Sequence, residues 1–140
     1  MSPSVSRNSL ISKPVPTGTR SVPSRSEADR LQGIRLAVGA LEDVVLWRNG
    51  VAGVESYDHT RGGARHHHAG LPKGSSDLIG VLAPLGRLLA LEVKTDRGRV
   101  TDEQQMFLAL VRRMGGFGAV VRNEEEALAA IARARGGLSE

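Results

Sequence analysis

The sequence predicts a single α/β domain in which a mixed sheet is flanked by helices. Apolar stretches of strand length alternate with helical patterns that begin at capping residues. Near the C-terminus, one helical stretch separates two buried strands, as a crossover between neighbouring strands does. The order predicted along the chain is helix, strand, strand, strand, helix, strand, helix.

The N-terminal part of this domain begins with a capping-box pattern from Ser26 to Asp29. The apolar residues that follow recur at helical spacing up to about Leu41. Residues 44–47, Val-Val-Leu-Trp, are typical of a strand. The stretch 48–76 is rich in glycine and histidine and shows no period, so we expect an irregular connection that is functional or mobile.

Two apolar strands joined by an Ala-Pro-Leu-Gly turn form the centre of the predicted sheet, over residues 77–82 and 88–94. Because side chains alternate along a strand, Glu92 and Lys94 share one face. A hairpin of this kind brings Asp77 within reach of both. Two carboxylates and an ammonium are the smallest set of side-chain groups with which a protein can bind a hard cation and hydrolyse a phosphodiester.

Two interpretations of these three charged residues remain open. They can form an ordinary ion pair on a half-exposed strand. Alternatively, the carboxylates bind a metal ion, and Lys94 orients a water molecule or holds a phosphate oxygen. A charged pair inside so apolar a stretch favours the second interpretation, because buried charges are rare unless they are paired or bound to a metal.

The C-terminal third repeats the pattern of cap, helix and strand. Thr101 to Gln104 is a second capping box, and it begins a helix that extends to about Met114. Residues 117–121 are typical of a short buried strand, and 123–135 of a final helix with its cap.

Composition limits the class of protein. The chain has 140 residues and no cysteine, which excludes a disulfide framework, a zinc–thiolate site and a thiol nucleophile. No apolar stretch is long enough for a membrane span or a signal peptide, so we expect no membrane partner and a reducing, cytoplasmic location.

The net charge of +4 is concentrated at the N-terminus, because residues 1–25 carry four Lys and Arg residues and no acid. We therefore expect residues 1–25 to be a disordered basic tail and residues 26–137 to be the folded domain. The tail can be a weak basic arm toward nucleic acid or a solubilising extension.

A local excess of basic residues surrounds the charged hairpin. Residues 61–99 hold seven Lys and Arg residues, one of them Arg87, against three Asp and Glu residues, and such an excess attracts phosphates. The residues expected to contact DNA are Arg61, Arg65, Lys73, Arg97 and Arg99. His66–His68 are better explained as part of this DNA-contacting loop than as a metal site, because adjacent side chains project in different directions.

Three motifs together resemble the VRR-NUC domain, a branch of the PD-(D/E)xK nuclease superfamily with a restriction-endonuclease-like core. The motifs are Gly70–Gly80, Leu91–Thr95 and Gly98–Gln104, followed by the glycine pair at 115–116. The resemblance covers about residues 26–135. One residue departs from the superfamily pattern, since serine precedes the first aspartate where the superfamily has proline.

The resemblance implies a role for each matching residue. The implied catalytic residues are Asp77, Glu92, Lys94 and Gln104. The implied metal ligands are Glu27, Asp77, Glu92 and the carbonyl of Val93. For two of these residues a structural alternative remains open: Gln104 can simply complete the capping box, and Glu27 can be an acid favoured by the helix dipole.

The function implied by the resemblance is that of a Mg²⁺- or Mn²⁺-dependent DNA endonuclease that selects branched DNA such as Holliday junctions. A homodimer in a bacterial or phage-infected cell is implied as well. Two alternatives use the same fold: a non-catalytic nucleic-acid-binding or accessory module, and a nuclease that trims flaps or defends against foreign DNA.

Overall fold

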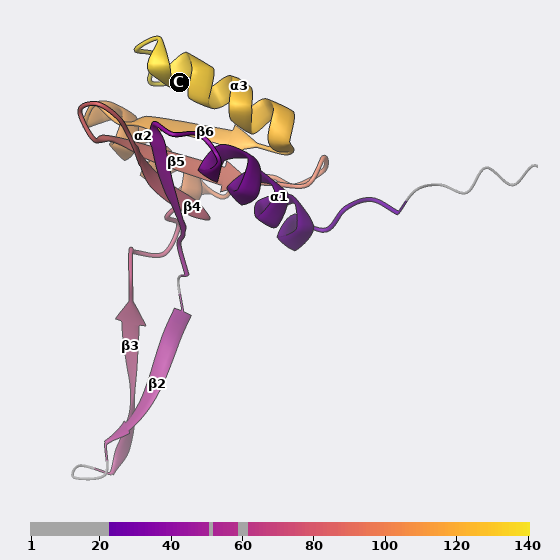
Figure 1. Cartoon of the computed structure of the whole chain (residues 1–140). Coiled ribbons are helices and arrows are strands. Elements are labelled where there is room, and N and C mark those ends of the chain that lie inside the picture. The colour runs from indigo at the N-terminus through magenta and orange to yellow at the C-terminus, as the bar shows by residue number, and fades with distance from the viewer. Residues whose placement is uncertain (1–22, 51, 59–61) are drawn as a thin grey trace, which may run out of the picture.

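The computed structural model describes residues 23–50, 52–58 and 62–140, and in residues 52–58 and 63–69 it describes only the backbone. The elements are α1 (Glu27–Gly39), β1 (Val44–Arg48), β2 (Ala52–Asp58), β3 (Gly63–Ala69), β4 (Leu78–Leu82), β5 (Arg87–Val93), α2 (Asp102–Arg113), β6 (Phe117–Val121) and α3 (Glu124–Arg135). The predicted order of helices and strands is confirmed for the main sheet and its helices (Figure 1). Within the described ranges, none of the helices has the length and apolar character needed to cross a membrane.

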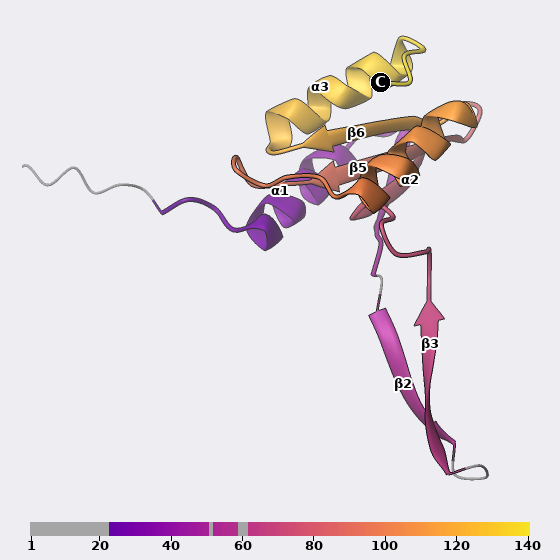
Figure 2. The same ribbon diagram turned by 180° about the vertical axis from the view of Figure 1, so that it is seen from behind.

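The main sheet has four strands in the order β1-β4-β5-β6. The pairs β1/β4 and β4/β5 are antiparallel, whereas β5 and β6 are parallel and are joined by α2, as the sequence predicted. Helices α1 and α3 cover one face of the sheet, and α2 covers the other (Figures 1 and 2). The fold is therefore a mixed sheet between two helical layers, consistent with a restriction-endonuclease-like core.

The core fixes which way the side chains of β5 point. Leu89, Leu91 and Val93 belong to the larger apolar cluster, which lies between the sheet and the α1/α3 layer. Ala90 instead packs in the smaller cluster under α2. Since side chains alternate along a strand, Glu92 faces away from the larger cluster, as the spacing predicted, and the structure shows that this is the α2 side.

The segment 48–76 is not simply irregular, and this expectation was wrong in part. β2 and β3 pair with each other along their whole length as a separate antiparallel hairpin, which projects away from the main sheet (Figure 1). His66–His68 lie in β3 rather than in a loop. Since the backbone of this hairpin lies apart from the main sheet, the alternation that marks the core strands was no guide to it.

Arg87 does not belong to a basic cluster around the charged hairpin, contrary to the sequence-based expectation. It begins β5, at the opposite end of the strand from Glu92. Its guanidinium donates hydrogen bonds to the carbonyls of Gly115, Ala134 and Leu138. Arg87 therefore holds the C-terminal ends of α2 and α3 and the segment that follows α3.

Candidate active site

Asp77, Glu92 and Lys94 lie together at one end of the two central strands. The register of β4 and β5 pairs Leu78 with Leu91, and its continuation places Asp77 opposite Glu92. One carboxylate oxygen of Asp77 accepts a hydrogen bond of 2.9 Å from the N–H of Val93. Lys94 Nζ lies 2.8 Å from Glu92 Oε1. The predicted constellation of two carboxylates and a lysine is therefore present.

Glu92 is fully buried, and its Oε2 atom has no hydrogen-bond partner among the described residues. Burial raises the pKa of Glu92, and the nearby charge of Asp77 adds to the effect, while the hydrogen bond from Lys94 opposes it. The resulting pKa is about 7. At neutral pH this carboxyl group is therefore poised between its two protonation states, which is typical of functional sites.

Lys94 stays protonated in this environment. Burial alone would lower its pKa, but the hydrogen bond to Glu92 and the negative charges of Glu92, Glu27 and Asp77 outweigh burial and raise the pKa of Lys94. The side chain of Lys94 is 11% exposed, so one end of the ion pair is open toward solvent and a substrate.

Gln104 both completes the capping box and contacts Glu92. Its Oε1 accepts a hydrogen bond of 2.9 Å from the N–H of Thr101 and completes the capping box of α2. Its Nε2 donates to Oε1 of Glu92. Because the oxygen must face the backbone donor, only the nitrogen is left for the carboxylate.

Replacement of Gln104 by glutamate is expected to separate these roles. Glutamate still accepts from the Thr101 N–H, but it places a second carboxyl group against Glu92. We expect the Gln104→Glu variant to unfold near the wild-type temperature at pH 5 and to lose about 10–100-fold in turnover. Gln104→Ala should lose turnover and about 1 kcal/mol of stability, because the Thr101 N–H loses its acceptor as well. Wild-type turnover in Gln104→Glu would show that the bond to Glu92 has no role at the site.

Asn49 supports Asp77, a role that no pattern in the sequence indicates. Its backbone N–H bonds to the carbonyl of Asp77 at 2.8 Å. Its side-chain Nδ2 donates to Ser75 Oγ at 2.7 Å and to the carbonyl of Ser76 at 3.0 Å. A lone asparagine after a strand is common in loops, so only the fold reveals that it fixes the backbone leading to Asp77.

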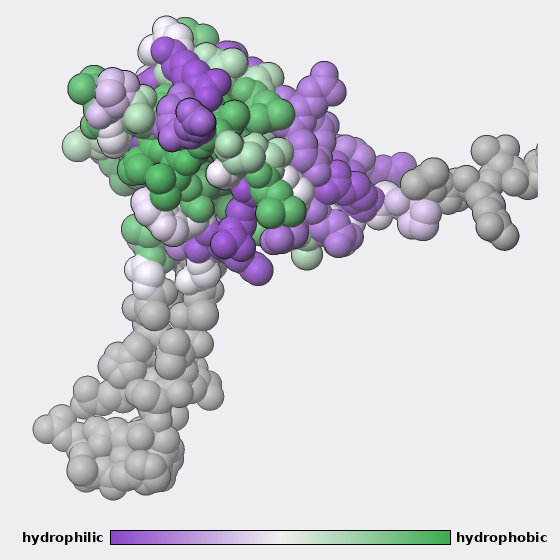
Figure 3. Space-filling view, viewed as in Figure 1, coloured by the Kyte–Doolittle hydropathy of each residue, from purple (hydrophilic) through white to green (hydrophobic). Residues whose placement is uncertain are grey.

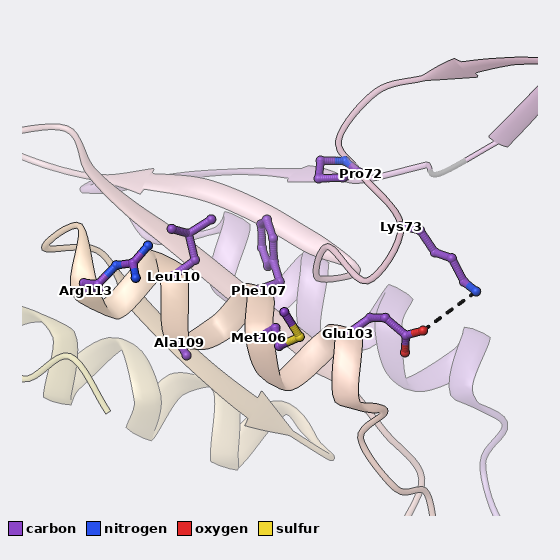
Figure 4. A pocket seen from close by; sticks show the side chains of 8 residues that line it. All are labelled: Pro72, Lys73, Glu103, Met106, Phe107, Ala109, Leu110 and Arg113. Carbon is purple, nitrogen blue, oxygen red and sulfur yellow. Dashed lines mark ion pairs between the residues drawn. The ribbon is translucent and has the colours of Figure 1, made fainter.

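The loop before Asp77 is also fixed against the first turn of α2. Gly74 has a φ of +89°, and a Cβ atom there would lie 2.6–2.9 Å from atoms of Glu103, two of which belong to its backbone. Figure 4 shows this loop passing beside α2, with Lys73 reaching toward Glu103. Gly74 therefore permits close packing of the loop on the helix that carries Gln104.

Arg30 fixes the turn that follows Lys94. It is buried in α1 and donates two hydrogen bonds, of 3.0 and 2.9 Å, to the carboxylate of Asp96. A third bond of 2.8 Å reaches the carbonyl of Arg122 at the end of β6. One side chain thus connects α1, this turn and β6, a role that an arginine on an amphipathic helix does not reveal in sequence.

Only some of the residues expected to contact DNA lie in the part of the chain whose side chains the structure describes. Arg97 and Arg99 are exposed in the segment that follows Lys94, beside the site. Lys73 is 83% exposed, and its Nζ lies 3.9 Å from Glu103 Oε1 (Figure 4). Arg61 lies outside the described residues, and so does the side chain of Arg65.

The site fits a hard divalent cation with few protein ligands. In the described ranges no group of three or more His, Asp and Glu side chains could hold a metal ion. Glu27 is exposed at the start of α1, and it acts on Lys94 through its charge without joining the two carboxylates. Magnesium commonly uses one or two protein carboxylates and several waters. The partnerless, buried oxygen of Glu92 beside Asp77 is the kind of acceptor that such an ion satisfies.

Comparison with known protein families matches residues 57–125 to the VRR-NUC domain. The matched range includes Asp77, Glu92, Lys94 and Gln104, and it leaves out α1 with Glu27. No curated protein matches the chain.

Proposed function

The chain carries a VRR-NUC domain over residues 57–125, a nuclease-type domain, and from this premise we propose that the protein is a metal-dependent DNA endonuclease selective for branched DNA. The observation that carries the proposal is the state of Glu92. This carboxyl group is fully buried, has one oxygen without a hydrogen-bond partner in the part of the chain that the structure describes, and lies beside a second acid and a lysine. Burying such a group is costly, and a bound cation would offset that cost.

Mg²⁺ or Mn²⁺ would be held by Asp77 and Glu92, with the carbonyl of Val93 as a further ligand, and would supply charge neutralisation at the phosphate and a more acidic bound water. The chain's own residues divide the remaining work. Lys94 and Gln104 both donate to Oε1 of Glu92, which leaves Oε2 for the cation. Because the pKa of Lys94 is raised, Lys94 acts as a fixed positive charge on a phosphate oxygen rather than as a proton acceptor.

The DNA would lie across the site where Lys73, Arg97 and Arg99 are exposed. A two-fold homodimer would present two such sites at a fixed separation, which suits paired incisions in a four-way junction. Glu27 would act as a further acid at the rim of the site through its charge on Lys94. A flap or defence nuclease would use the same catalytic group and differ in the DNA that its loops accept.

The test is cleavage of labelled four-way-junction, flap, single-stranded and linear duplex DNA with Mg²⁺, Mn²⁺ or EDTA. The matched control is Asp77→Asn, since asparagine still accepts from the Val93 N–H but has no charge for a cation. We expect metal-dependent cutting of the junction that falls at least about 100-fold in the variant, with DNA binding retained. Preferential cutting of flaps would assign the other nuclease role, and binding without cleavage of any substrate would leave a binding module.

A further inference from the structure

The two edges of the main sheet differ in how they are protected. Along β6, residues whose backbone groups face β5 alternate with residues whose backbone groups face outward. The carbonyl of Val121 accepts a hydrogen bond from the N–H of Lys94, so Val121 faces β5. Gly118, three residues away, therefore faces outward. The outward N–H of Gly118 bonds to the carbonyl of Ser139, and its carbonyl accepts two bonds from the guanidinium of Arg112. This edge is therefore blocked against another strand.

The opposite edge, β1, is open. The backbone N–H of Asn49 donates to the carbonyl of Asp77, and the carbonyl of Asp43 accepts from the N–H of Ala83. The backbone groups of the odd-numbered residues in this stretch therefore face β4. The backbone groups of residues 44, 46 and 48 therefore face outward. In the described part of the chain, the N–H of residue 44 bonds to Leu41 and the other outward groups have no backbone partner. Unpaired groups along an edge strand are a template for another strand.

The side chains of β1 are apolar where a solvent-facing strand would be polar. Val45 is 51% exposed and Trp47 is 53% exposed, and both lie on the face of the sheet opposite α1 and α3. Figure 3 shows the side of the domain that carries α1, where hydrophobic surface over the body of the domain adjoins hydrophilic surface over the N-terminal half of α1. An exposed, apolar edge strand without proline or lysine lacks the features that normally prevent pairing.

We propose that β1 pairs antiparallel with β1 of a second copy, about a two-fold axis at Leu46, so that two four-stranded sheets become one continuous sheet. This inference rests on the homodimer of the proposed function and identifies its interface. A two-fold axis requires a self-complementary surface, and an antiparallel edge strand paired with itself is such a surface. The outward N–H and C=O of residue 46 in each copy then bond to those of the other.

The side chains agree with this register. Centring the pair on Leu46 places Val45 directly opposite Trp47 of the second copy, which buries two exposed apolar side chains as a cross-strand pair. The symmetry repeats this contact.

The first test compares Arg48→Pro with Arg48→Ala in the full chain by sedimentation and by fluorescence. Proline removes an outward N–H that β4 does not use, whereas alanine removes only the exposed side chain. Trp47 is the only tryptophan in the chain, so its emission should shift to longer wavelength when a dimer dissociates. We expect a dimer for wild type and Arg48→Ala, and a monomer with red-shifted emission for Arg48→Pro. A monomeric wild type, or a dimer that survives in Arg48→Pro, would overturn the proposal.

A second test uses the absence of cysteine from the chain. Leu46→Cys would place two thiols opposite each other across the axis, at a Cα separation of about 5.5 Å that a disulfide can bridge. Oxidation should give a covalent dimer of Leu46→Cys, but not of the control Leu128→Cys on α3, where the leucine is also partly exposed. This test remains available if the proline variant does not fold. Equal cross-linking of both variants would overturn the proposed register.

The two proposals fail separately. The variant Asp77→Asn should remain a dimer by sedimentation even though its cleavage is lost. A dimer through β1 that cuts no DNA would contradict the nuclease assignment alone, whereas an active monomer would contradict the interface alone.

Discussion

Glu92→Gln should stabilise the metal-free protein at pH 8 and abolish cleavage. Glutamine keeps an oxygen for Lys94 and Gln104, and it places an NH₂ group where the partnerless Oε2 lies beside Asp77. The variant therefore keeps the hydrogen bonds of the site and removes a buried negative charge. It would lose a ligand of the proposed divalent cation.

The sign of this effect follows from the raised pKa of Glu92. An ordinary glutamate has a pKa of 4.5, and this one has a pKa of about 7 in the folded protein. Below pH 4.5 the carboxyl group is protonated in both the folded and the unfolded protein, so it does not lower the free energy of unfolding. As the pH rises through 7, the folded state must hold a buried carboxylate, and stability is lost. The difference corresponds to about 3 kcal/mol, of which part is offset in the variant because Lys94 loses its charged partner.

The measurement is denaturant unfolding of wild type and Glu92→Gln at pH 5 and pH 8, in EDTA and in Mg²⁺. We expect little difference at pH 5, a more stable variant at pH 8 in EDTA, and stabilisation by Mg²⁺ in the wild type alone. Glu125→Gln, at an exposed acid in the first turn of α3, is the control and should show no pH-dependent gain. An equal gain at both pH values would mean that titration of Glu92 is not its cause.

Lys94→Met should reduce turnover at saturating DNA by about 100–1,000-fold, because a fixed charge on the phosphate is lost. Methionine keeps the length and apolar contacts of the side chain. Since Asp77 and Glu92 remain, Mg²⁺ should still stabilise the variant against unfolding. Loss of turnover with retained metal binding would therefore assign Lys94 to the reaction itself.

Lys73→Met is the matched comparison, because Lys73 is the exposed lysine expected to contact DNA away from the carboxylates. It should weaken DNA binding and leave turnover at saturating DNA nearly unchanged. If Lys94→Met behaves in the same way as Lys73→Met, Lys94 is a binding residue. Unchanged turnover in Lys94→Met would contradict the catalytic assignment.

Alternation along β5 explains why so much of the site could be predicted from sequence. The apolar positions 89, 91 and 93 fix one face of the strand, so Glu92 and Lys94 had to share the other. The capping boxes likewise located the starts of α1 and α2. Both are local rules that act within a few residues, and a single sequence records such rules fully.

The supporting residues could not be predicted, because their partners lie far away in the chain. Asn49 bonds to Ser75 and Asp77, and Arg30 bonds to Asp96 and Arg122. No spacing rule relates such residues before the fold is known. The sequence also does not reveal that Gln104 makes two contacts at once, which is possible because the two ends of one amide group can meet different partners.

The closed edge of β6 has a consequence for the length of the chain. The carbonyl of Ser139 occupies the outward N–H of Gly118, and Arg87 holds the segment that carries it by bonding to Leu138. A chain shortened before Leu138 would free the N–H of Gly118, so that only the bonds from Arg112 to its carbonyl would still block β6. If those bonds also yielded, each molecule of the proposed dimer would have a second edge for pairing, and a closed pair would give way to an open-ended polymer of sheets. Residues 138–140 would thus help to limit how large the proposed assembly can grow.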